Sequence, residues 1–291
     1  MDDLQVSICK VILGVALLGS WLGKDSQASQ NPVPSATVFK VPSLLQAGIP
    51  MPGFDPAQHQ RADSILSVFE NSTPDIQYDY VEALGDGRGI TAGRGFTTGT
   101  GDLLAAVELY TMRVPDNVLA TYLPRLREIA AKGDGTTSGL DGLTEAWKKA
   151  AQDQVFRSVQ DEIVDRTVYQ PAVKHWQDQG CATPIALLVI YDTVLQHGNG
   201  KDPDGAPAIV ARTNTAMGGP PSQDVPEMDW VEKLLEVRKD VLMNATDEET
   251  RDQWRESVDR CNALQELLKS GNTDLKQGLS FHVWDREWKI S

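Results

Sequence analysis

Basic residues are scarce in this 291-residue sequence, and their scarcity argues against one large class of function. Lysine and arginine number 27 against 41 aspartates and glutamates, which gives a formal net charge of −14. Proteins that bind nucleic acid need a basic surface, so we expect no nucleic-acid partner. The acidity has two open interpretations: it keeps the protein soluble, or it attracts a cationic partner to an acidic cleft.

Cysteine and histidine are also rare. Apart from Cys9, the chain has Cys181 and Cys261, an even pair compatible with one disulfide in an oxidising compartment or with two buried thiols. The four histidines are scattered, and no Cys/His spacing typical of a metal site occurs. We therefore expect no metal and no other cofactor.

Long apolar runs are lacking as well. The apolar run 11–22 is short for a membrane span of ~20 residues, and Ser26-Gln-Ala28 after it is typical of signal-peptide cleavage. The prolines that follow predict an extended segment. We predict a signal peptide over 1–28, an extended segment over 29–54 and a folded domain over 55–291. The expected location is extracellular, without a stable membrane partner, although a short uncleaved anchor stays open.

The folded part is expected to begin with a helix that carries a carboxylate at its end. Asp55-Pro56 is a cap followed by a helix-starting proline, and the helix should run to about Asn71. The helix dipole and the apolar neighbours of Glu70 favour its protonated form, which can act as a general acid. From this helix alone, a solvated carboxylate without a role is the simpler interpretation. The core-facing positions of this helix are Ala62, Ile65, Leu66 and Phe69.

A glycine-dense stretch from Glu82 to Asp102 follows. Its alternating glycines let the backbone turn sharply while it presents Asp86 and Arg88. We expect Glu70 and Asp86 to face each other across a cleft and to cleave a sugar polymer, with Arg88 keeping Asp86 ionised.

The remaining pattern is mostly helical. The apolar segment 183–197 predicts a buried central helix, inside which Asp192 needs a partner. A core ion pair with an arginine and a direct contact with substrate are both open. An aromatic segment, 279–289, should pack back onto the body. We further expect a short helix over 75–84, short strands within 90–98, a loop over 132–142, and helices over 102–112, 116–131, 143–179, 206–217, 227–243 and 247–270.

Several blocks of the sequence together resemble the family 46 chitosanases, from about residue 56 to residue 275. The resemblance is carried by Glu70-Asn-Ser, by Gly85-Asp-Gly-Arg-Gly-x-Thr91 and by Gly99-Thr-Gly-Asp102. It implies an endo-acting, inverting hydrolase of β-1,4-linked glucosamine polymers. The implied fold class is mainly α (α+β, lysozyme-like), with two helical lobes flanking a substrate cleft and a small antiparallel sheet beside the cleft.

The resemblance also implies roles for single residues. Glu70 matches the general acid, Asp86 the general base, and Thr91 the residue that helps to hold the attacking water. The implied substrate-binding residues are Arg88, Asp102, Glu82 and His197. The implied ion-pair network beneath the site comprises Asp192, Arg238 and Arg260, with Arg255 as an alternative to Arg260.

The expected partner is chitosan, a polyamine whose charge suits an acidic cleft, and we expect the protein to be a monomer. Two other functions stay open at this point. One is a secreted, non-catalytic binder of cationic polysaccharide. The other is a lysozyme-like hydrolase of peptidoglycan or chitin, although the carboxylates of peptidoglycan fit an acidic protein poorly.

Overall fold

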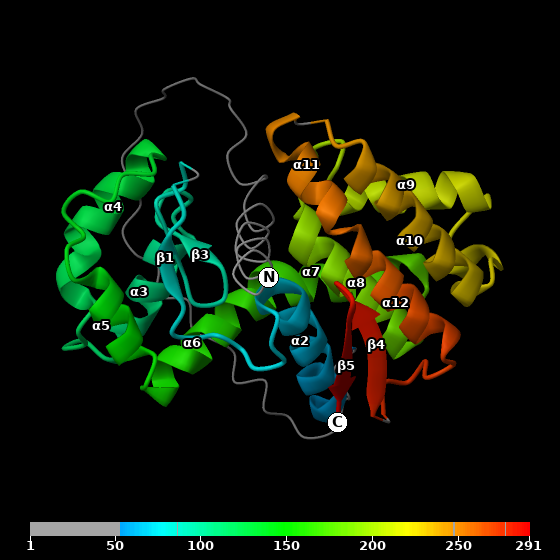
Figure 1. Ribbon diagram of the computed structural model, residues 1–291, viewed down its shortest axis with the longest axis horizontal. Helices are drawn as coiled ribbons and strands as arrows, with labels where there is room; N and C mark the ends of the chain where they lie inside the picture. The colour runs from blue at the N-terminus through cyan, green and yellow to red at the C-terminus, as the bar shows by residue number, and fades with distance from the viewer. Residues whose placement is uncertain (1–52, 86, 247, 277) are drawn as a thin grey trace.

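The computed structural model describes residues 53–85, 87–246, 248–276 and 278–291. The predicted signal peptide and nearly all of the predicted extended segment lie outside the described residues. The described part is mainly helical, with a three-stranded and a two-stranded antiparallel sheet (Figure 1). The predicted mainly α (α+β) class, including a small antiparallel sheet, is confirmed.

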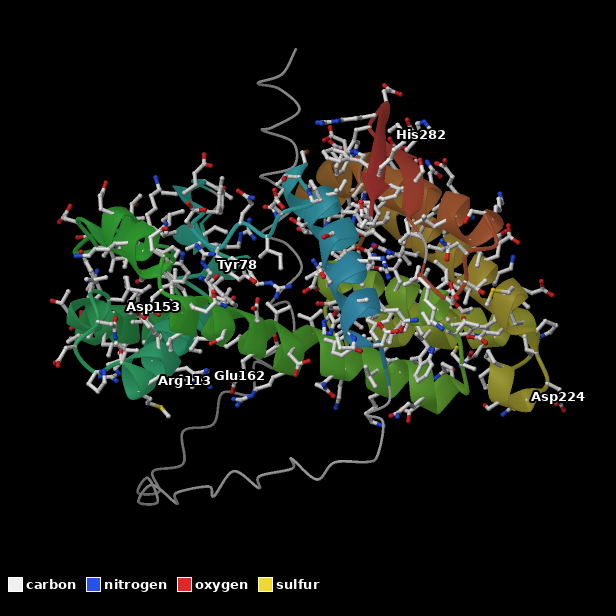
Figure 2. All side chains as sticks on the ribbon, turned by 90° about the horizontal axis from the view of Figure 1, so that it is seen from below. Tyr78, Arg113, Asp153, Glu162, Asp224 and His282 are labelled. Atoms are coloured by element: carbon white, nitrogen blue, oxygen red, sulfur yellow. The ribbon has the colours of Figure 1, made fainter. Side chains whose placement is uncertain are left out.

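The helices and strands form two groups with a helix running between them (Figure 1). The first group, here called the sheet lobe, holds β1 (Val81–Ala83), β2 (Ile90–Ala92), β3 (Phe96–Thr97), α3 (Asp102–Arg113), a short 3-10 helix (Ala120–Tyr122), α4 (Leu123–Lys132) and α5 (Leu143–Ala150). The connection to the second group is α6 (Gln154–Val164), followed by a π-helical segment, Asp165–Tyr169. Arg113 of α3 forms an ion pair with Glu162 of α6 at this connection (Figure 2).

The second group, here called the helical lobe, is built around a buried helix. Its members are α2 (Pro56–Asn71), α7 (Gln170–Gln179), α8 (Pro184–His197), α9 (Ala206–Met217), α10 (Glu227–Met243), α11 (Glu248–Glu256), α12 (Val258–Lys269), β4 (Leu279–Val283) and β5 (Arg286–Ile290). Almost every residue of α8 is buried, as its apolar sequence predicted. The β4–β5 hairpin packs on α2 and α12, with the rings of Phe69 and Phe281 5.7 Å apart.

The three-stranded sheet has the order β1-β2-β3, so the glycine-rich stretch supplies its turns. Glu82 pairs with Thr91, and Thr91 pairs with Thr97. The expected helix over 75–84 is wrong: turns lead into β1. The carbonyl of Tyr78 accepts from the Trp147 indole at 3.0 Å, so distant partners replace the hydrogen bonds of a helix.

Other boundaries also differ from the sequence-based expectation, and the segment 143–179 is divided into α5, α6, the π-helical segment and α7. The helix expected over 116–131 begins only at Leu123, and Pro124 lies in its first turn, where a residue without a backbone donor is tolerated. The single helix expected over 247–270 is two helices that meet at Ser257. The buried hydroxyl of Ser257 donates to the carbonyl of Trp254 at 2.6 Å and accepts from Gln196 at 2.6 Å. These side-chain hydrogen bonds of Ser257 lie at the point where α11 ends and α12 begins.

Cys181 and Cys261 are both buried and both free, so the two-thiol alternative is correct and the disulfide alternative is wrong. Burial raises the pKa of the Cys181 thiol to about 12, with a further contribution from Glu227.

Within the described residues, no group of three or more His, Cys, Asp or Glu side chains is placed to hold a metal ion. Nor is any described helix long and apolar enough to cross a membrane.

Candidate active site

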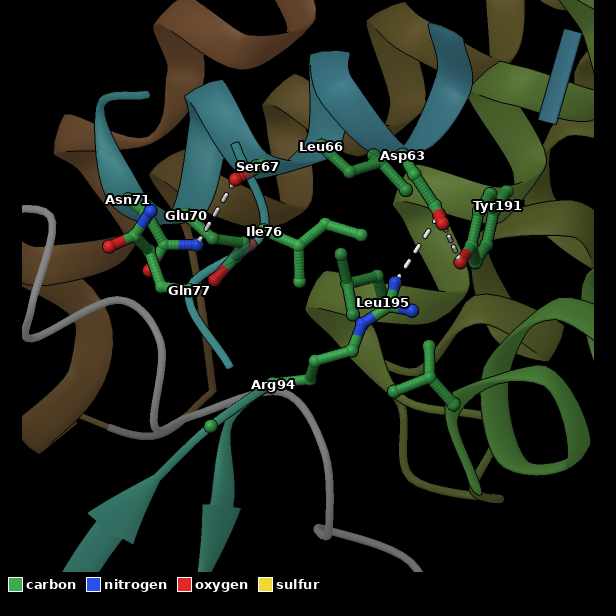
Figure 3. A pocket seen from close by; sticks show the side chains of 12 residues that line it. Asp63, Leu66, Ser67, Glu70, Asn71, Ile76, Gln77, Arg94, Tyr191 and Leu195 are labelled. Carbon is green, nitrogen blue, oxygen red and sulfur yellow. Dashed lines mark hydrogen bonds and ion pairs between the residues drawn. The ribbon is translucent and has the colours of Figure 1, made fainter. Parts of the chain in front are cut away.

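Glu70 lies in the last turn of α2, at the wall of a pocket between the two lobes. The capping box at Asp55 and Gln58 starts α2, and Ser72 in the left-handed conformation ends it, so local sequence sets the position of Glu70 on the helix. Glu70 is 9% exposed. The pocket is also lined by Asp63, Leu66, Ser67, Asn71, Ile76, Gln77, Gly93, Arg94, Val164, Tyr191 and Leu195 (Figure 3).

A row of alternating charges lies behind Glu70. Arg260 Nη1 is 2.5 Å from Glu70 Oε1, and Arg260 Nη2 is 2.6 Å from Asp192 Oδ1. Asp192 Oδ2 is in turn 2.5 Å from Arg238 Nη1. The side chains of Asp192, Arg238 and Arg260 are fully buried. The surroundings of Glu70 are therefore not purely apolar, contrary to the sequence-based expectation.

The ion pairs expected around Asp192 are present, and Arg260 is the second arginine. Burial opposes the charge of Asp192, but the Arg238 and Arg260 guanidinium groups outweigh burial and lower its pKa. Arg255 has a different place: it is exposed, donates to the carbonyl of Met243 and forms an ion pair with Asp252. Arg255 therefore contributes no charge to the buried row.

The structure contradicts the expectation that His197 binds substrate. Its Nδ1 donates to the carbonyl of Asp204 at 2.9 Å, and its Nε2 accepts from Arg238 Nε at 3.2 Å. Burial, followed by the charge of Arg238, lowers the pKa of His197 well below its usual range, so the ring is neutral. His197 extends the buried row at the end of α8 and has no nitrogen left for a ligand.

The three-stranded sheet supplies the opposite side of the site. Thr91 lies on the central strand β2 with 0% of its surface exposed, and no described residue forms a hydrogen bond with its Oγ1. Arg88 is half-buried, and its carbonyl accepts from Gly99 N at 2.9 Å. Asp86 lies outside the described residues, so its role as general base stays a prediction.

The other two predicted substrate-binding acids also belong to the sheet lobe. Glu82 is half-buried on β1 and accepts from the Tyr80 hydroxyl at 2.9 Å. Asp102 Oδ1 accepts from Thr97 N, Leu103 N and the Thr100 hydroxyl, which holds the turn before α3. Asp102 Oδ2 is shielded from solvent and has no hydrogen-bond partner among the residues described.

Burial raises the pKa of Asp102 to about 6, even though the hydrogen bonds from Thr100 and Thr97 work in the other direction. This carboxyl group therefore changes its charge in the mildly acidic range. Its unpartnered Oδ2 is compatible with the predicted contact to a substrate amine, which stays a prediction.

Sequence reasoning missed a second charged cluster in the same pocket. Arg94 Nη1 is 2.7 Å from Asp161, and Arg94 Nη2 is 3.3 Å from Asp63. The Tyr191 hydroxyl donates to Asp63 at 3.0 Å (Figure 3). A signal was available for Asp63: it precedes Glu70 by seven residues, which places both on one face of a helix.

Comparison with known proteins shows to which family the chain belongs. The sequence profile of glycosyl hydrolase family 46 matches residues 64–279. The chain belongs to this family. A chitosanase of Bacillus subtilis (strain 168) is 47% identical over 237 residues, which are 81% of this chain and 85% of the relative. A chitosanase of Streptomyces sp. (strain N174) is 34% identical and covers 81% of this chain and 83% of its own length.

Solved structures of family 46 relatives share the fold. The native chitosanase from Bacillus subtilis MY002 superposes with a TM-score of 0.77 at 46% identity, covering 82% of this chain and 100% of its own. A family 46 chitosanase of Gynuella sunshinyii, solved in complex with chitotetraose, gives a TM-score of 0.76 at 44% identity, covering 82% and 99%. The family identified from sequence blocks is confirmed.

Proposed function

We propose that this family 46 protein is an endo-acting, inverting chitosanase that cleaves β-1,4 bonds between glucosamine units. The observation that carries the proposal is the placement of Glu70, at the edge of a pocket between the lobes and oriented by the row Arg260–Asp192–Arg238. The relatives support the choice of substrate. They are chitosanases, and one was solved with chitotetraose and another with 6 GlcN.

In the proposed reaction, Glu70 donates a proton to the glycosidic oxygen that leaves, and Asp86 removes a proton from the attacking water. Thr91 orients that water through its hydroxyl. An inverting hydrolase keeps its two carboxyl groups about 6.5–9.5 Å apart so that one water fits between them. The Arg260 guanidinium, 2.5 Å from Glu70 Oε1, holds the carboxyl group in one orientation, which reduces the entropy lost on reaching the reacting geometry.

Charge supports the choice of a polyamine as substrate. The chain has a formal net charge of −14, and the predicted substrate-binding residues include the acids Glu82 and Asp102. A cleft of one sign raises the local concentration of the opposite sign, and salt screens this attraction. The KM for chitosan should therefore rise with salt, and heavily acetylated chitin, with few charged amines, should be a poor substrate.

Product analysis tests the function and the mechanism together. Chitosan of defined acetylation is digested, products are sized, and NMR follows the anomer that forms first. We expect short oligomers from internal cleavage, with the α anomer appearing first. Glu70→Gln and Asp86→Asn should each lose about 100-fold or more of kcat. The control Glu128→Gln changes an exposed acid on α4 and should be fully active.

Three results would contradict parts of this proposal. Initial formation of the β anomer would mean a retaining mechanism. Full activity of either carboxamide variant would remove that residue from its role. Binding of chitosan without release of reducing ends would favour the non-catalytic polysaccharide binder instead.

We also propose that the protein is secreted as a monomer. The proposal of secretion rests on the apolar run and the small-x-small pattern that ends at Ala28. Expression with residues 1–28 in place should release a chain into the medium that begins at Ser29, as N-terminal sequencing can show. Size-exclusion chromatography with light scattering measures the mass of the secreted form, and a dimer mass would contradict the monomer.

A further inference from the structure

Arg94 is a mostly buried cation that the reaction proposed above does not use, yet it lines the same pocket as Glu70 (Figure 3). Its side chain is 12% exposed. Its two terminal nitrogens contact two different carboxylates, Asp161 at 2.7 Å and Asp63 at 3.3 Å. The guanidinium is thus neutralised within the protein.

The two carboxylates come from different parts of the fold. Asp161 lies on the connecting helix α6, whereas Asp63 lies on α2 of the helical lobe. Arg94 itself lies in the turn between β2 and β3, three residues after Thr91. Asp63 precedes Glu70 by about two turns, or ~10 Å along the helix. The Arg94–Asp63 ion pair therefore joins the sheet that carries Thr91 to the helix that carries Glu70.

The sheet end of this ion pair is held against α6. The Arg94 backbone N–H donates to Gln160 Oε1 at 3.3 Å, and Gln160 is fully buried. Gly93 has a φ of +55°, and a Cβ added there would lie 2.1 Å from Gln160 Oε1. The turn is therefore packed so closely that only glycine fits, which limits the positions that Arg94 can take.

The helix end is held as well. Asp63 Oδ1 accepts from the hydroxyl of Tyr191, which is 1% exposed and lies on the central helix α8. Tyr191 is adjacent in sequence to Asp192, the centre of the buried charge row behind Glu70. Both sides of the ion pair thus rest on well-packed parts of the protein.

The ion pair also separates two hollows of the surface. A second pocket, lined by Phe54, His59 and Asp165 among others, shares Asp63, Arg94 and Tyr191 with the Glu70 pocket. The pair thus forms a common wall where the lobes approach each other.

We propose that the Arg94–Asp63 ion pair sets the separation of the two walls of the cleft and thereby positions Glu70 relative to the sheet. Arg94 and Asp63 are then positioning residues that do not touch the reacting atoms. This inference rests on the proposed function, because inverting hydrolysis needs a gap that fits one water. A cleft that is too wide misplaces the acid, which lowers kcat more than it weakens substrate binding.

The kinetic test is a double-mutant cycle on chitosan. Asp63→Asn keeps an oxygen for the Tyr191 hydroxyl and removes the charge that faces Arg94. We expect kcat to fall about 10-fold or more, with KM within about 3-fold of wild type. Arg94→Gln should show the same loss, and the double variant should show no further loss. The matched control is Asp161→Asn, which removes the other carboxylate of Arg94 but not the contact with α2, and it should keep kcat within about 3-fold.

A distance measurement tests the same inference without activity. Cysteines replace Glu128 on α4 and Lys174 on α7, whose side chains are 61% and 74% exposed, and carry spin labels. The native Cys181 and Cys261 are buried and should not be labelled. Pulsed electron spin resonance should show a broader label–label distance distribution in Asp63→Asn than in wild type or Asp161→Asn.

The kinetic and distance measurements together decide the inference. Unchanged kcat in Asp63→Asn overturns the inference, and so does a lower kcat with an unchanged distance distribution. If wild type releases no product from chitosan, the proposed function fails, while the spin-label distances still decide whether the ion pair sets the separation of the lobes.

Discussion

Thr91, on β2, carries a buried hydroxyl that forms no hydrogen bond with any described residue. An unsatisfied buried polar group costs about 1–3 kcal/mol, so a structural reason for a hydroxyl at this position is lacking among the described residues. If the hydroxyl instead orients the attacking water, its removal should change kcat but not stability.

Replacing Thr91 by valine should therefore lower kcat without lowering stability. We expect kcat on chitosan to fall about 10-fold because the water loses an orienting partner. The midpoint of urea unfolding should stay or rise. Thr97→Val is the control, because Thr97 is buried opposite Thr91 and its hydroxyl contacts that of Thr100. It should lose stability and keep kcat, and the reverse pattern would remove Thr91 from its role.

The charge of Asp102 should appear in the pH dependence of substrate affinity. Burial raises the pKa of Asp102 to about 6, so protonation below pH 6 removes the negative charge predicted to hold a substrate amine. The KM of wild type should rise as pH falls from 7 to 5. Asp102→Asn should have a high KM at every pH in that range. A wild-type KM that is constant with pH would separate Asp102 from substrate binding.

At the scale of elements, the loop between α4 and α5 supports the glycine-rich turn between β1 and β2. A Cβ added at Gly135 would lie 1.9 Å from the carbonyl oxygen of Gly87 and 2.9 Å from the Gly89 nitrogen. Gly87 follows Asp86 directly in the sequence. A glycine in one loop thus allows close approach by the backbone of the loop that contains the predicted base.

Gly135→Ala should shift this turn and lower kcat about 10-fold or more, with a stability loss of about 1–3 kcal/mol from the forced displacement. Gly133→Ala is the control: Gly133 has a φ of +63° but nothing within 4 Å of an added Cβ. It should cost about 1 kcal/mol and leave kcat unchanged. Chitosan kinetics and urea unfolding of both variants measure the difference, and equal kcat values would contradict the argument.

The sequence patterns predicted elements well where local signals decide them. The bounds of α2 follow from its proline, its cap and its core-facing spacing, and the central helix α8 follows from its apolar composition. The prediction of a helix over 75–84 was wrong because its carbonyls have other partners. The carbonyl of Tyr78 accepts from Trp147 and Gln160, and the carbonyl of Tyr80 accepts from Gly93 N. Those partners lie in other segments, so local propensity did not reveal them.

For the whole molecule, two buried groups should give opposite pH dependences of stability. The pKa of His197 is lowered by burial and by Arg238, so only the unfolded chain takes up its proton below pH 6.5. The contribution of His197 to stability is therefore lost as pH falls below 6.5. The pKa of Asp102 is raised from 3.8 to about 6, so between these values the folded chain holds the extra proton and stability rises as pH falls.

The two contributions have opposite signs, and single variants should expose each of them. Relative to wild type, His197→Gln should lose less stability as pH falls, whereas Asp102→Asn should lose more. Urea unfolding at half-unit pH intervals measures both slopes against wild type. Parallel curves for the three proteins would mean that neither group titrates as its burial implies.

The amino-acid sequence by itself determined the family, the mainly helical class and the end position of Glu70 on its helix, because periodicity, caps and ordered motifs are local properties of the chain. The tertiary structure decided which charges meet. It placed Arg260 against Glu70, enclosed His197 within the buried charge row and joined Arg94 to Asp63 across the lobes. Such contacts depend on the packing of segments far apart in the sequence, where burial makes each unpaired charge costly.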